Sequence, residues 1–367
     1  MKKIIKLLLL SLSSIVTLFL LVAISINLFR LADKNTDTFD YLENSSNKVI
    51  LFIGDGMGQN QIKNTELFLD KKLFFTSIDK MGTVNTYSKN TFWPTDSAAS
   101  ATAMATGKKV YNTFVASSFG KPIKSISEYV KEKNMGVGIV TTDTLAGATP
   151  ASFSAHALRR SHTEDIIETQ LNNNIDLYLG AGNQTYLPYK SRFEEKGYSF
   201  IQKYSELPNT KTKVLGSFSE INNYKHTDEA PTLPMLTKYA IDYFEKHYPE
   251  GYFLMIEGAH IDKSNHSNDI DNMIKYLDEF DNSIELAFNM LSEENVAFII
   301  TADHESGNLD LANSKSEITN DLYQSTKHTA KDVYYFIYHK NNYEINKIPN
   351  NIDNTDIFEM IKKILGI

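Results

Sequence analysis

The chain has 367 residues and 42% of them are hydrophobic, so it can bury a large core in one large α/β domain or in two ordinary domains. Its formal net charge of -8 argues against a general attraction to nucleic acid, which is not expected as a dedicated partner. The absence of cysteine excludes thiolate nucleophiles, disulfides and cysteine-based zinc sites, so a transition-metal site must be built from His, Asp, Glu and hydroxyl groups.

Residues 1–30 have the pattern of a signal peptide or signal anchor. Three lysines among the first six residues precede an uncharged run of 23 residues, 7–29, which Arg30 closes. A run of this length can cross a bilayer as a helix and is longer than the usual apolar region of a cleaved signal. We favour an uncleaved anchor, with the chain after Arg30 outside the cytoplasmic membrane. Ala23 and Ser25 leave signal cleavage open, which would give a secreted or periplasmic protein.

Residues 31–47 are polar and suit a linker between a membrane and the domain that follows, residues 48–367. This domain opens with a continuous apolar run, 48–53, which is typical of a strand buried on both faces. Similar runs, with helical patterns between several of them, recur at Val137–Thr141, Asp176–Leu179, Tyr252–Ile256, Val296–Thr301 and Val333–Tyr338. Strands that alternate with helices predict an α/β fold of three layers, in which helices cover both faces of a large, mostly parallel sheet.

Two other stretches of this domain have patterns of their own. Residues 185–230 are rich in Lys, Tyr, Ser and Asn and have weak periodicity, so we expect a surface excursion of the same domain. Residues 354–365 have apolar side chains at helical spacing, which predicts a helix docked on the sheet.

Residues 95–107 are very small and predict a helix with a candidate nucleophile at its start. Thr95 or Asp96 can cap this helix, and Gly107 can end it. A helix of small residues can lie close against a sheet, and the free N–H groups beside Ser97 can hold an anionic group. Ser97 is therefore a candidate nucleophile, and a mere capping or packing role is an equal alternative on this stretch alone.

Several acidic, hydroxyl and imidazole side chains follow the predicted strands. In parallel sheets the ligand site lies beyond the carboxyl ends of the strands, so these side chains are expected at one edge. They are Asp55, Thr149, Glu257, Asp303 and His304.

Asp262 and His266 are four residues apart and share one face if a helix starts there. One carboxylate and one imidazole from the same helical turn suit Zn²⁺, which needs further ligands from elsewhere. Taken alone, such a pair is more often a surface hydrogen bond. His328, just before the last apolar strand, has the same alternative as a surface residue in a turn.

Thr149 and Pro150 are typical of a helix start, with Thr149 as the N-cap and Pro150 in the first helical position. From that start, His156 and Arg160 are predicted to share one helix face. Arg160 could then clamp a phosphate group with two parallel N–H bonds.

Taken together, these motifs resemble those of the alkaline phosphatases, from about Val49 to the C-terminus. The resemblance is carried, in family order, by Ile53–Gly58, Thr95–Ala103, Gly147–Ala151 with His156 and Arg160, Glu257–Ala259 with Asp262 and His266, Thr301–Glu305, and His328–Ala330. It implies an alkaline-phosphatase-like catalytic domain over residues 48–367. It also implies hydrolysis of small-molecule phosphate monoesters to an alcohol and inorganic phosphate.

The resemblance implies a role for each motif residue. Ser97 matches the nucleophile that becomes a phosphoserine, and Arg160 matches the arginine that holds the phosphate oxygens. Two zinc ions are implied, one at Asp262, His266 and His328 and the other at Asp55, Asp303 and His304. A third metal, usually Mg²⁺, is implied at Asp55, Thr149 and Glu257.

Two departures from better-known members and one further likeness matter. Gly147 stands where some members carry Asp or His, so it cannot contact a metal or its waters through a side chain. Lys263, next to Asp262, resembles a lysine that some bacterial members place near the phosphate through water. The interval between His304 and His328 is short, so a dimer contact made by an insertion there is not expected, while a homodimer of another kind stays open.

Two alternatives to a phosphomonoesterase remain. One is a phosphodiesterase or a sulfatase-like hydrolase of the same superfamily, although the residues around Ser97 and the presence of Arg160 favour monoesters. The other is a surface protein that keeps the fold to bind metal or phosphate without catalysis. The complete set of motif residues favours the enzyme.

Overall fold

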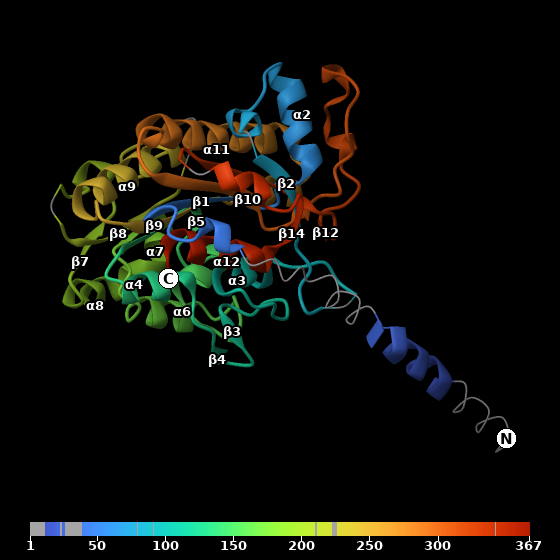
Figure 1. Ribbon diagram of the computed structural model, residues 1–367, viewed down its shortest axis with the longest axis horizontal. Helices are drawn as coiled ribbons and strands as arrows, with labels where there is room; N and C mark the ends of the chain where they lie inside the picture. The colour runs from blue at the N-terminus through green and yellow to red at the C-terminus, as the bar shows by residue number, and fades with distance from the viewer. Residues whose placement is uncertain are drawn as a thin grey trace.

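The computed structural model describes residues 12–22, 24–25, 39–78, 80–90, 92–209, 211–221, 226–341 and 343–367. Residues 12–22 and 24–25 are helical and project from the body of the molecule (Figure 1), and the Phe19 ring lies 6.1 Å from the ring of Phe92. Within the described part of the chain, no helix is long and apolar enough to cross a membrane. The rest of the predicted signal peptide or anchor, residues 1–11, 23 and 26–30, lies outside the described residues. So does the first part of the predicted linker, residues 31–38.

The end of the predicted linker belongs to the folded body. Residues 39–42 form a short 3-10 helix, η1 (Phe39–Leu42), in which Phe39 and Leu42 are buried. The amide of Asn44 also donates to the carbonyl of Lys363, near the C-terminus. Because Phe39 and Leu42 are buried, η1 belongs to the folded domain although the residues around it are polar.

A sheet of ten strands forms the middle layer, in the order β14-β2-β13-β10-β1-β9-β5-β6-β8-β7. The strands are β1 (Lys48–Gly54), β2 (Lys80–Asn85), β5 (Gly136–Thr144), β6 (Leu177–Ala181), β7 (Tyr198–Ile201), β8 (Lys213–Phe218), β9 (Tyr252–Gly258), β10 (Val296–Ala302), β13 (Val333–His339) and β14 (Asn351–Asp353). All neighbours pair in parallel except β13, which is antiparallel to both β10 and β2. The predicted large, mostly parallel sheet is confirmed.

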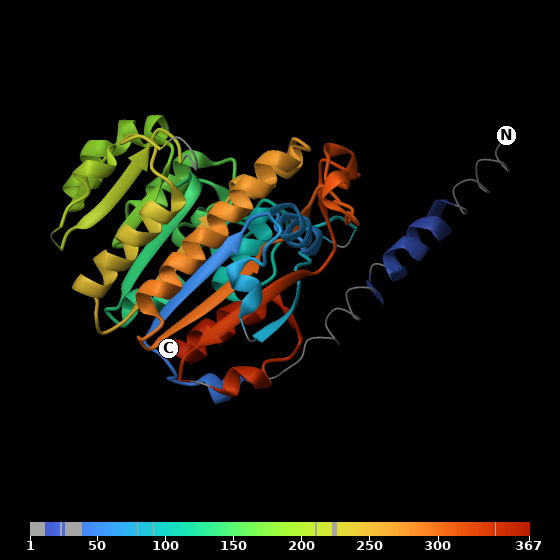
Figure 2. The ribbon, with the colours of Figure 1, turned by 90° about the horizontal axis from the view of Figure 1, so that it is seen from above.

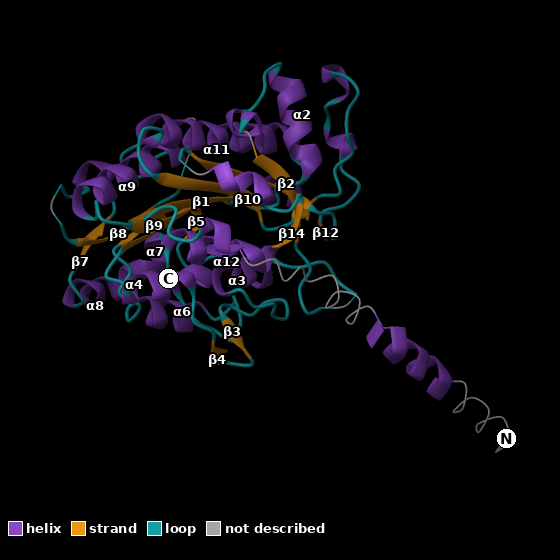
Figure 3. Cartoon of the chain, in the orientation of Figure 1, coloured by secondary structure: helices purple, strands orange, loops and turns teal. Residues whose placement is uncertain are grey.

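Helices cover both faces of this sheet, which gives the predicted three layers (Figures 1 and 2). On one face lie α2 (Gln59–Leu69), α9 (Leu233–His247), α10 (His260–His266) and α11 (Ile270–Leu291). On the other lie α3 (Ser97–Thr106), α4 (Ile126–Glu132), α5 (Ala148–Ser154), α6 (Thr163–Gln170) and α12 (Asn354–Leu365). Figure 3 shows the strands enclosed between the two helical layers.

Shorter elements complete the described chain. Two small two-stranded sheets pair β3 (Ser117–Ser118) with β4 (Lys121–Pro122), and β11 (Glu305–Ser306) with β12 (His328–Thr329). Two short helices are α7 (Asn183–Tyr186) and α8 (Lys190–Glu195). The remaining 3-10 turns are η2 (Phe74–Ser77), η3 (Leu187–Tyr189), η4 (Tyr204–Glu206), η5 (Lys315–Glu317), η6 (Asn320–Leu322) and η7 (Tyr343–Lys347).

The stretch 185–230 is more than the predicted surface excursion, because it supplies two strands of the main sheet. In β8 five of the six residues are buried, and β7 forms the edge beyond it. Both pair in parallel, β8 with β6 and β7 with β8. The weak periodicity of this stretch reflects short strands near an edge, where fewer side chains need to be apolar.

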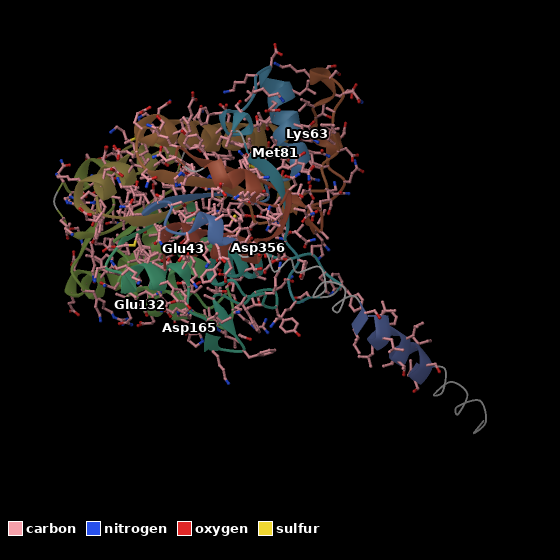
Figure 4. All side chains as sticks on the ribbon, viewed as in Figure 1. Glu43, Lys63, Met81, Glu132, Asp165 and Asp356 are labelled. Carbon is pink, nitrogen blue, oxygen red and sulfur yellow. The ribbon has the colours of Figure 1, made fainter. Side chains whose placement is uncertain are left out.

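The small residues of α3 let it lie deep in the molecule. All ten of its residues are buried, and the helix packs between α5 and α12. It ends where Gly107 takes a left-handed conformation, φ 66°, which a residue with a side chain adopts only at a cost. Charged side chains such as Lys63, Glu132 and Asp165 instead lie on the outer surface (Figure 4).

Candidate active site

The candidate residues meet at the carboxyl ends of the three central strands. The register aligns Gly54 at the end of β1 with Gly258 of β9 and Ala302 of β10. Asp55 directly follows β1, and Asp303 directly follows β10. Because the three strands are parallel, the polar residues at their ends are brought to one edge, as the sequence predicts.

Ser97 stands at the amino end of α3, directly above this edge. It is the first residue of the helix, and Asp96 is the N-cap, with its side chain accepting a bond from the amide of Ala99 at 3.0 Å. Ser97 is 3% exposed, and its Oγ lies 3.3 Å from Nε2 of His304. The predicted helix start therefore places the serine hydroxyl beside an imidazole and near free helix N–H groups.

Arg160 reaches the same place from a loop. Its backbone amide donates to the carbonyl of Thr113 at 2.7 Å, and its Nη1 lies 3.4 Å from Oδ2 of Asp96. The Asp96 carboxylate also accepts the amide of Thr113 at 3.1 Å. Asp96 thus links the N-cap of the Ser97 helix to the guanidinium of Arg160. The Arg160 side chain is 40% exposed, so a ligand can reach it.

The predicted helix running from Thr149 through Arg160 is wrong. The helix α5 is Ala148–Ser154, with Gly147 as its N-cap and Thr149 inside its first turn. His156 and Arg160 therefore do not share a helix face. His156 instead faces Glu128, with 3.2 Å between Nε2 and Oε2, while its Nδ1 lies 2.8 Å from the carbonyl of Ala116.

Two groups of possible metal ligands meet at His304. Asp55, Asp303 and His304 offer ligand atoms that all lie within 4.8 Å of one another, and so do Asp262, His304 and His328. His266, predicted to join Asp262 and His328, lies 3.1 Å from the former and 3.2 Å from the latter. All six predicted zinc ligands are thus brought together, with the His304 ring between the two groups.

Burial and crowding make this cluster electrostatically costly without a cation. Burial raises the pKa of Asp55 and Asp303 well above the usual range, and the negative charges of neighbouring carboxylates raise them further. The same burial keeps the pKa of His304 well below its ordinary value. A divalent cation among these groups would favour the ionised carboxylates and the neutral imidazole, which are the forms that bind metals.

For Asp262 and His266, which lie on α10, the pKa values change in the opposite directions to those of Asp303 and His304. Burial of Asp262 opposes its ionisation, but the hydrogen bond from His266 and the nearby imidazoles hold its pKa below the usual range. The hydrogen bond to Asp262 raises the pKa of His266 to about 9. The predicted helical pairing of Asp262 with His266 is confirmed, because both lie on α10.

A third group lies next to the first two. Glu257, on β9, is 1% exposed, and its Oε2 accepts a bond from the Thr141 hydroxyl. Burial, followed by the negative charge of Asp143, raises the pKa of Glu257 to about 7. The Thr149 hydroxyl, which is close enough to lower that pKa, is buried and has no hydrogen-bond partner.

The donor atoms fit the metals that the resemblance implies. Oδ1 of Asp55, Oδ2 of Asp303 and Oγ1 of Thr149 are buried atoms without hydrogen bonds, so each has a lone pair available. Two imidazole-and-carboxylate groups suit Zn²⁺, whereas the third group offers only oxygen atoms, which suit Mg²⁺.

Several supporting residues escape sequence reasoning. The Ser306 hydroxyl donates to Oδ1 of Asp262 and lies 3.3 Å from Nδ1 of His304, so it orients one residue of each group. Thr113 links Asp96 to Arg160 through its backbone, which leaves no signal in its side chain. Lys263 forms an ion pair with Asp143, with 2.5 Å between Nζ and Oδ1.

Comparison with known proteins agrees with this geometry. The structure of alkaline phosphatase from the Antarctic bacterium TAB5 superimposes with a TM-score of 0.75 at 28% identity, covering 87% of this chain and 98% of that chain. A His-to-Asp mutant of the same enzyme, with Mg bound in its M3 site, gives a TM-score of 0.75 at 26% identity and covers 88% and 99%. The architecture is therefore that of an alkaline phosphatase.

The sequence comparisons carry the assignment to the family. The alkaline phosphatase family model matches residues 46–359. Alkaline phosphatase 3 of Bacillus subtilis is 32% identical over 285 residues, which cover 71% of this chain and 61% of that relative. The chain belongs to the alkaline phosphatase family, and it spans about three fifths of the length of the Bacillus subtilis relatives that it matches.

Proposed function

We propose that this protein is an exported phosphatase that hydrolyses small phosphate monoesters through a phosphoserine on Ser97. The observation that carries the proposal is the position of the Ser97 hydroxyl, 3.3 Å from His304, the residue shared by both groups of metal ligands. Arg160, held by Asp96 at the cap of the same helix, adds a cation for the phosphate oxygens. A nucleophile, an anion-binding cation and a metal-binding edge are thus combined.

The reaction has two displacements at phosphorus. In the first, Oγ of Ser97 loses its proton and forms a bond to phosphorus while the ester bond breaks, and the leaving oxygen gains a proton to give the alcohol. In the second, a water oxygen attacks the phosphoserine, which frees the Ser97 oxygen and releases phosphate. Arg160 and the free N–H groups at the start of α3 hold the non-bridging oxygens throughout both steps.

The metals belong to the proposal as well. Asp262, His266 and His328 would hold one Zn²⁺, and Asp55, Asp303 and His304 the other. Asp55, Thr149 and Glu257 would hold Mg²⁺. When bound, a pair of zinc ions supplies Lewis-acid stabilisation of the attacking and leaving oxygens and lowers the pKa of water. Ser306 would keep Asp262 and His304 oriented for this purpose.

Export rests on the basic and apolar pattern of residues 1–30. An uncleaved segment would attach the enzyme to the outer face of the cytoplasmic membrane, and a cleaved one would release it. Fractionation of producing cells and N-terminal sequencing of the extracytoplasmic protein distinguish the two. Recovery of all the protein in the cytoplasm would contradict export.

The test of the activity is hydrolysis of p-nitrophenyl phosphate by the full-length protein, before and after chelation, with Zn²⁺ and Mg²⁺ restored separately. We expect zinc to restore activity, and Ser97→Ala to lack it while still binding zinc. Brief acid quenching of the wild-type reaction should also trap phosphate on Ser97. An active Ser97→Ala variant would contradict the covalent route.

Two further substrates test the alternatives. Bis(p-nitrophenyl) phosphate and p-nitrophenyl sulfate report phosphodiesterase and sulfatase activity under the same conditions. Turnover of either one without turnover of the monoester would keep the fold and overturn the substrate class. Zinc binding with no turnover of any ester would favour a non-catalytic binding protein.

A further inference from the structure

The carboxylate of Asp143 fills the space beside Gly147. Asp143 lies near the end of β5, four residues before Gly147. A Cβ atom placed on Gly147 would lie only 2.6 Å from Oδ2 of Asp143 and 2.9 Å from the carbonyl oxygen of Thr144. The missing side chain at position 147 therefore leaves room that a neighbouring carboxylate occupies.

This carboxylate is tied to Glu257. The amide of Asp143 donates to Oγ1 of Thr141 at 2.9 Å, and the same Thr141 hydroxyl donates to Oε2 of Glu257. The charge of Asp143 is the largest contribution, after burial, to the raised pKa of Glu257. Two acidic groups are thus held near one another by a shared threonine.

Independent evidence for a missing ligand comes from Thr149. Thr149 is 1% exposed, and its hydroxyl lies close enough to Glu257 to lower the pKa of that carboxyl, but it is not in hydrogen-bond geometry with any group of the described chain. Oδ1 of Asp55 is likewise buried without a hydrogen bond. Leaving buried polar atoms unpaired is costly, so both atoms point to a group that is bound in the working protein.

Lys263, the cation that contacts Asp143, is not a hydrogen-bond partner of Thr149 or of Oδ1 of Asp55. Lys263 pairs with Oδ1 of Asp143, while Oδ2 is the atom that lies on the Gly147 side. The Lys263 side chain is 50% exposed, so its ammonium remains partly hydrated. The Lys263 ammonium acts on two carboxylates, those of Asp143 and Glu257, and its single positive charge leaves an excess of negative charge there.

We propose that Asp143 replaces the side chain missing at Gly147 and completes a Mg²⁺ site with Asp55, Thr149 and Glu257. This inference rests on the proposed function, because it adds a residue to the third metal site of that enzyme. All four side chains offer oxygen, the donor that Mg²⁺ prefers. Lys263 opposes the ion by charge, so it sets how tightly the site binds.

The test measures Mg²⁺ binding to the full-length, zinc-loaded protein by titration calorimetry and by metal content after dialysis. We expect Asp143→Asn to weaken Mg²⁺ binding at least tenfold, because a neutral amide replaces the carboxylate. Lys263→Ala should tighten binding several-fold, because the competing positive charge is removed. Glu132→Gln, which alters an exposed carboxylate on α4, is the matched control and should bind as the wild type does.

Zinc content and the thermal midpoint without Mg²⁺ report whether each variant is folded. A folded Asp143→Asn variant that binds Mg²⁺ as tightly as the wild type overturns the inference. Weaker binding by Lys263→Ala also overturns it, because the lysine would then support the ion rather than oppose it. Zinc-dependent phosphatase activity in a wild type that binds no Mg²⁺ would overturn this inference alone, whereas loss of all ester hydrolysis would overturn the proposed function.

Discussion

A buried acid on α11, Glu279, makes the stability of the protein depend on pH. This helix packs against α10, which carries Asp262 and His266. Glu279 is 7% exposed, and its carboxylate accepts the amide of Leu233 at 3.2 Å. Burial raises its pKa from 4.5 to about 7, although that hydrogen bond works in the opposite direction.

The sign of the effect follows from the direction of this change. Because the folded protein binds the Glu279 proton more tightly than the unfolded chain does, the stabilisation is fully present below pH 4.5. It is lost as the pH rises through about 7. A gap of about 2.5 between the folded and unfolded pKa corresponds to about 3 kcal/mol of unfolding free energy, at about 1.36 kcal/mol per pKa unit.

The substitution that isolates this effect is Glu279→Gln, which keeps an oxygen acceptor for Leu233 and cannot ionise. Urea unfolding of the metal-free protein should give equal stabilities for variant and wild type at about pH 3.5, where Glu279 is protonated in both states. At pH 8.5 the variant should be more stable by about 3 kcal/mol. Glu285→Gln, at an exposed position of the same helix, is the matched control and should differ little at either pH. A gap that does not change with pH would refute the reasoning.

Three further outcomes are expected. Ser97→Ala should lower kcat/KM for p-nitrophenyl phosphate by at least about 10³-fold with unchanged zinc content, and a rate within tenfold of the wild type would contradict its role. Thr113→Gly should raise the unfolding free energy by about 1 kcal/mol, because Thr113 has φ 75° and glycine adopts this conformation without strain, so a lower midpoint in urea unfolding would exclude strain there. Chelation should lower the thermal midpoint, and zinc at about a thousandfold excess over Kd should restore about 4 kcal/mol, whereas a midpoint insensitive to zinc would argue against metal at Asp55 and Asp303.

The central sheet and the helix of Ser97 could be predicted because their signals are local. Five-residue and six-residue apolar runs mark strands buried on both faces, and β1 and β10 are buried along their whole length. The helix α3 begins at Ser97, is capped by Asp96 and ends at Gly107, as its residues indicate. The C-terminal helix α12, Asn354–Leu365, has the predicted bounds.

The position of Arg160 could not be predicted, because contacts distant in sequence determine it. The Thr149-Pro150 pattern indicates a helix start correctly to within two residues, but not that the helix stops at Ser154. After Ser154 the position of the chain depends on a backbone hydrogen bond, in which the amide of Arg160 donates to the carbonyl of Thr113, 47 residues earlier. Such a pairing depends on the loop around Thr113, whose backbone conformation is unusual for threonine and is not indicated by its neighbours.

The contact between Gly147 and the carboxylate of Asp143 could not be predicted from the sequence either. Glycine there indicates only that a side chain is missing, and the carboxylate that takes up the space comes from Asp143. The partner of Lys263 follows from the same arrangement. These contacts depend on how β5 ends against β9, which periodicity does not determine.

The wide spread of the site along the chain has a consequence for biogenesis. The ligand groups that meet at His304 are drawn from positions as far apart as Asp55 and His328. Closing loops of this length is slow and occurs late, because their entropy must be lost before the contacts form. A nascent or partly translocated chain that lacks β10 and β12 therefore has neither complete ligand group. If the proposed metal site is correct, metal capture would be among the last steps of maturation, after β10 and β12 have joined the fold.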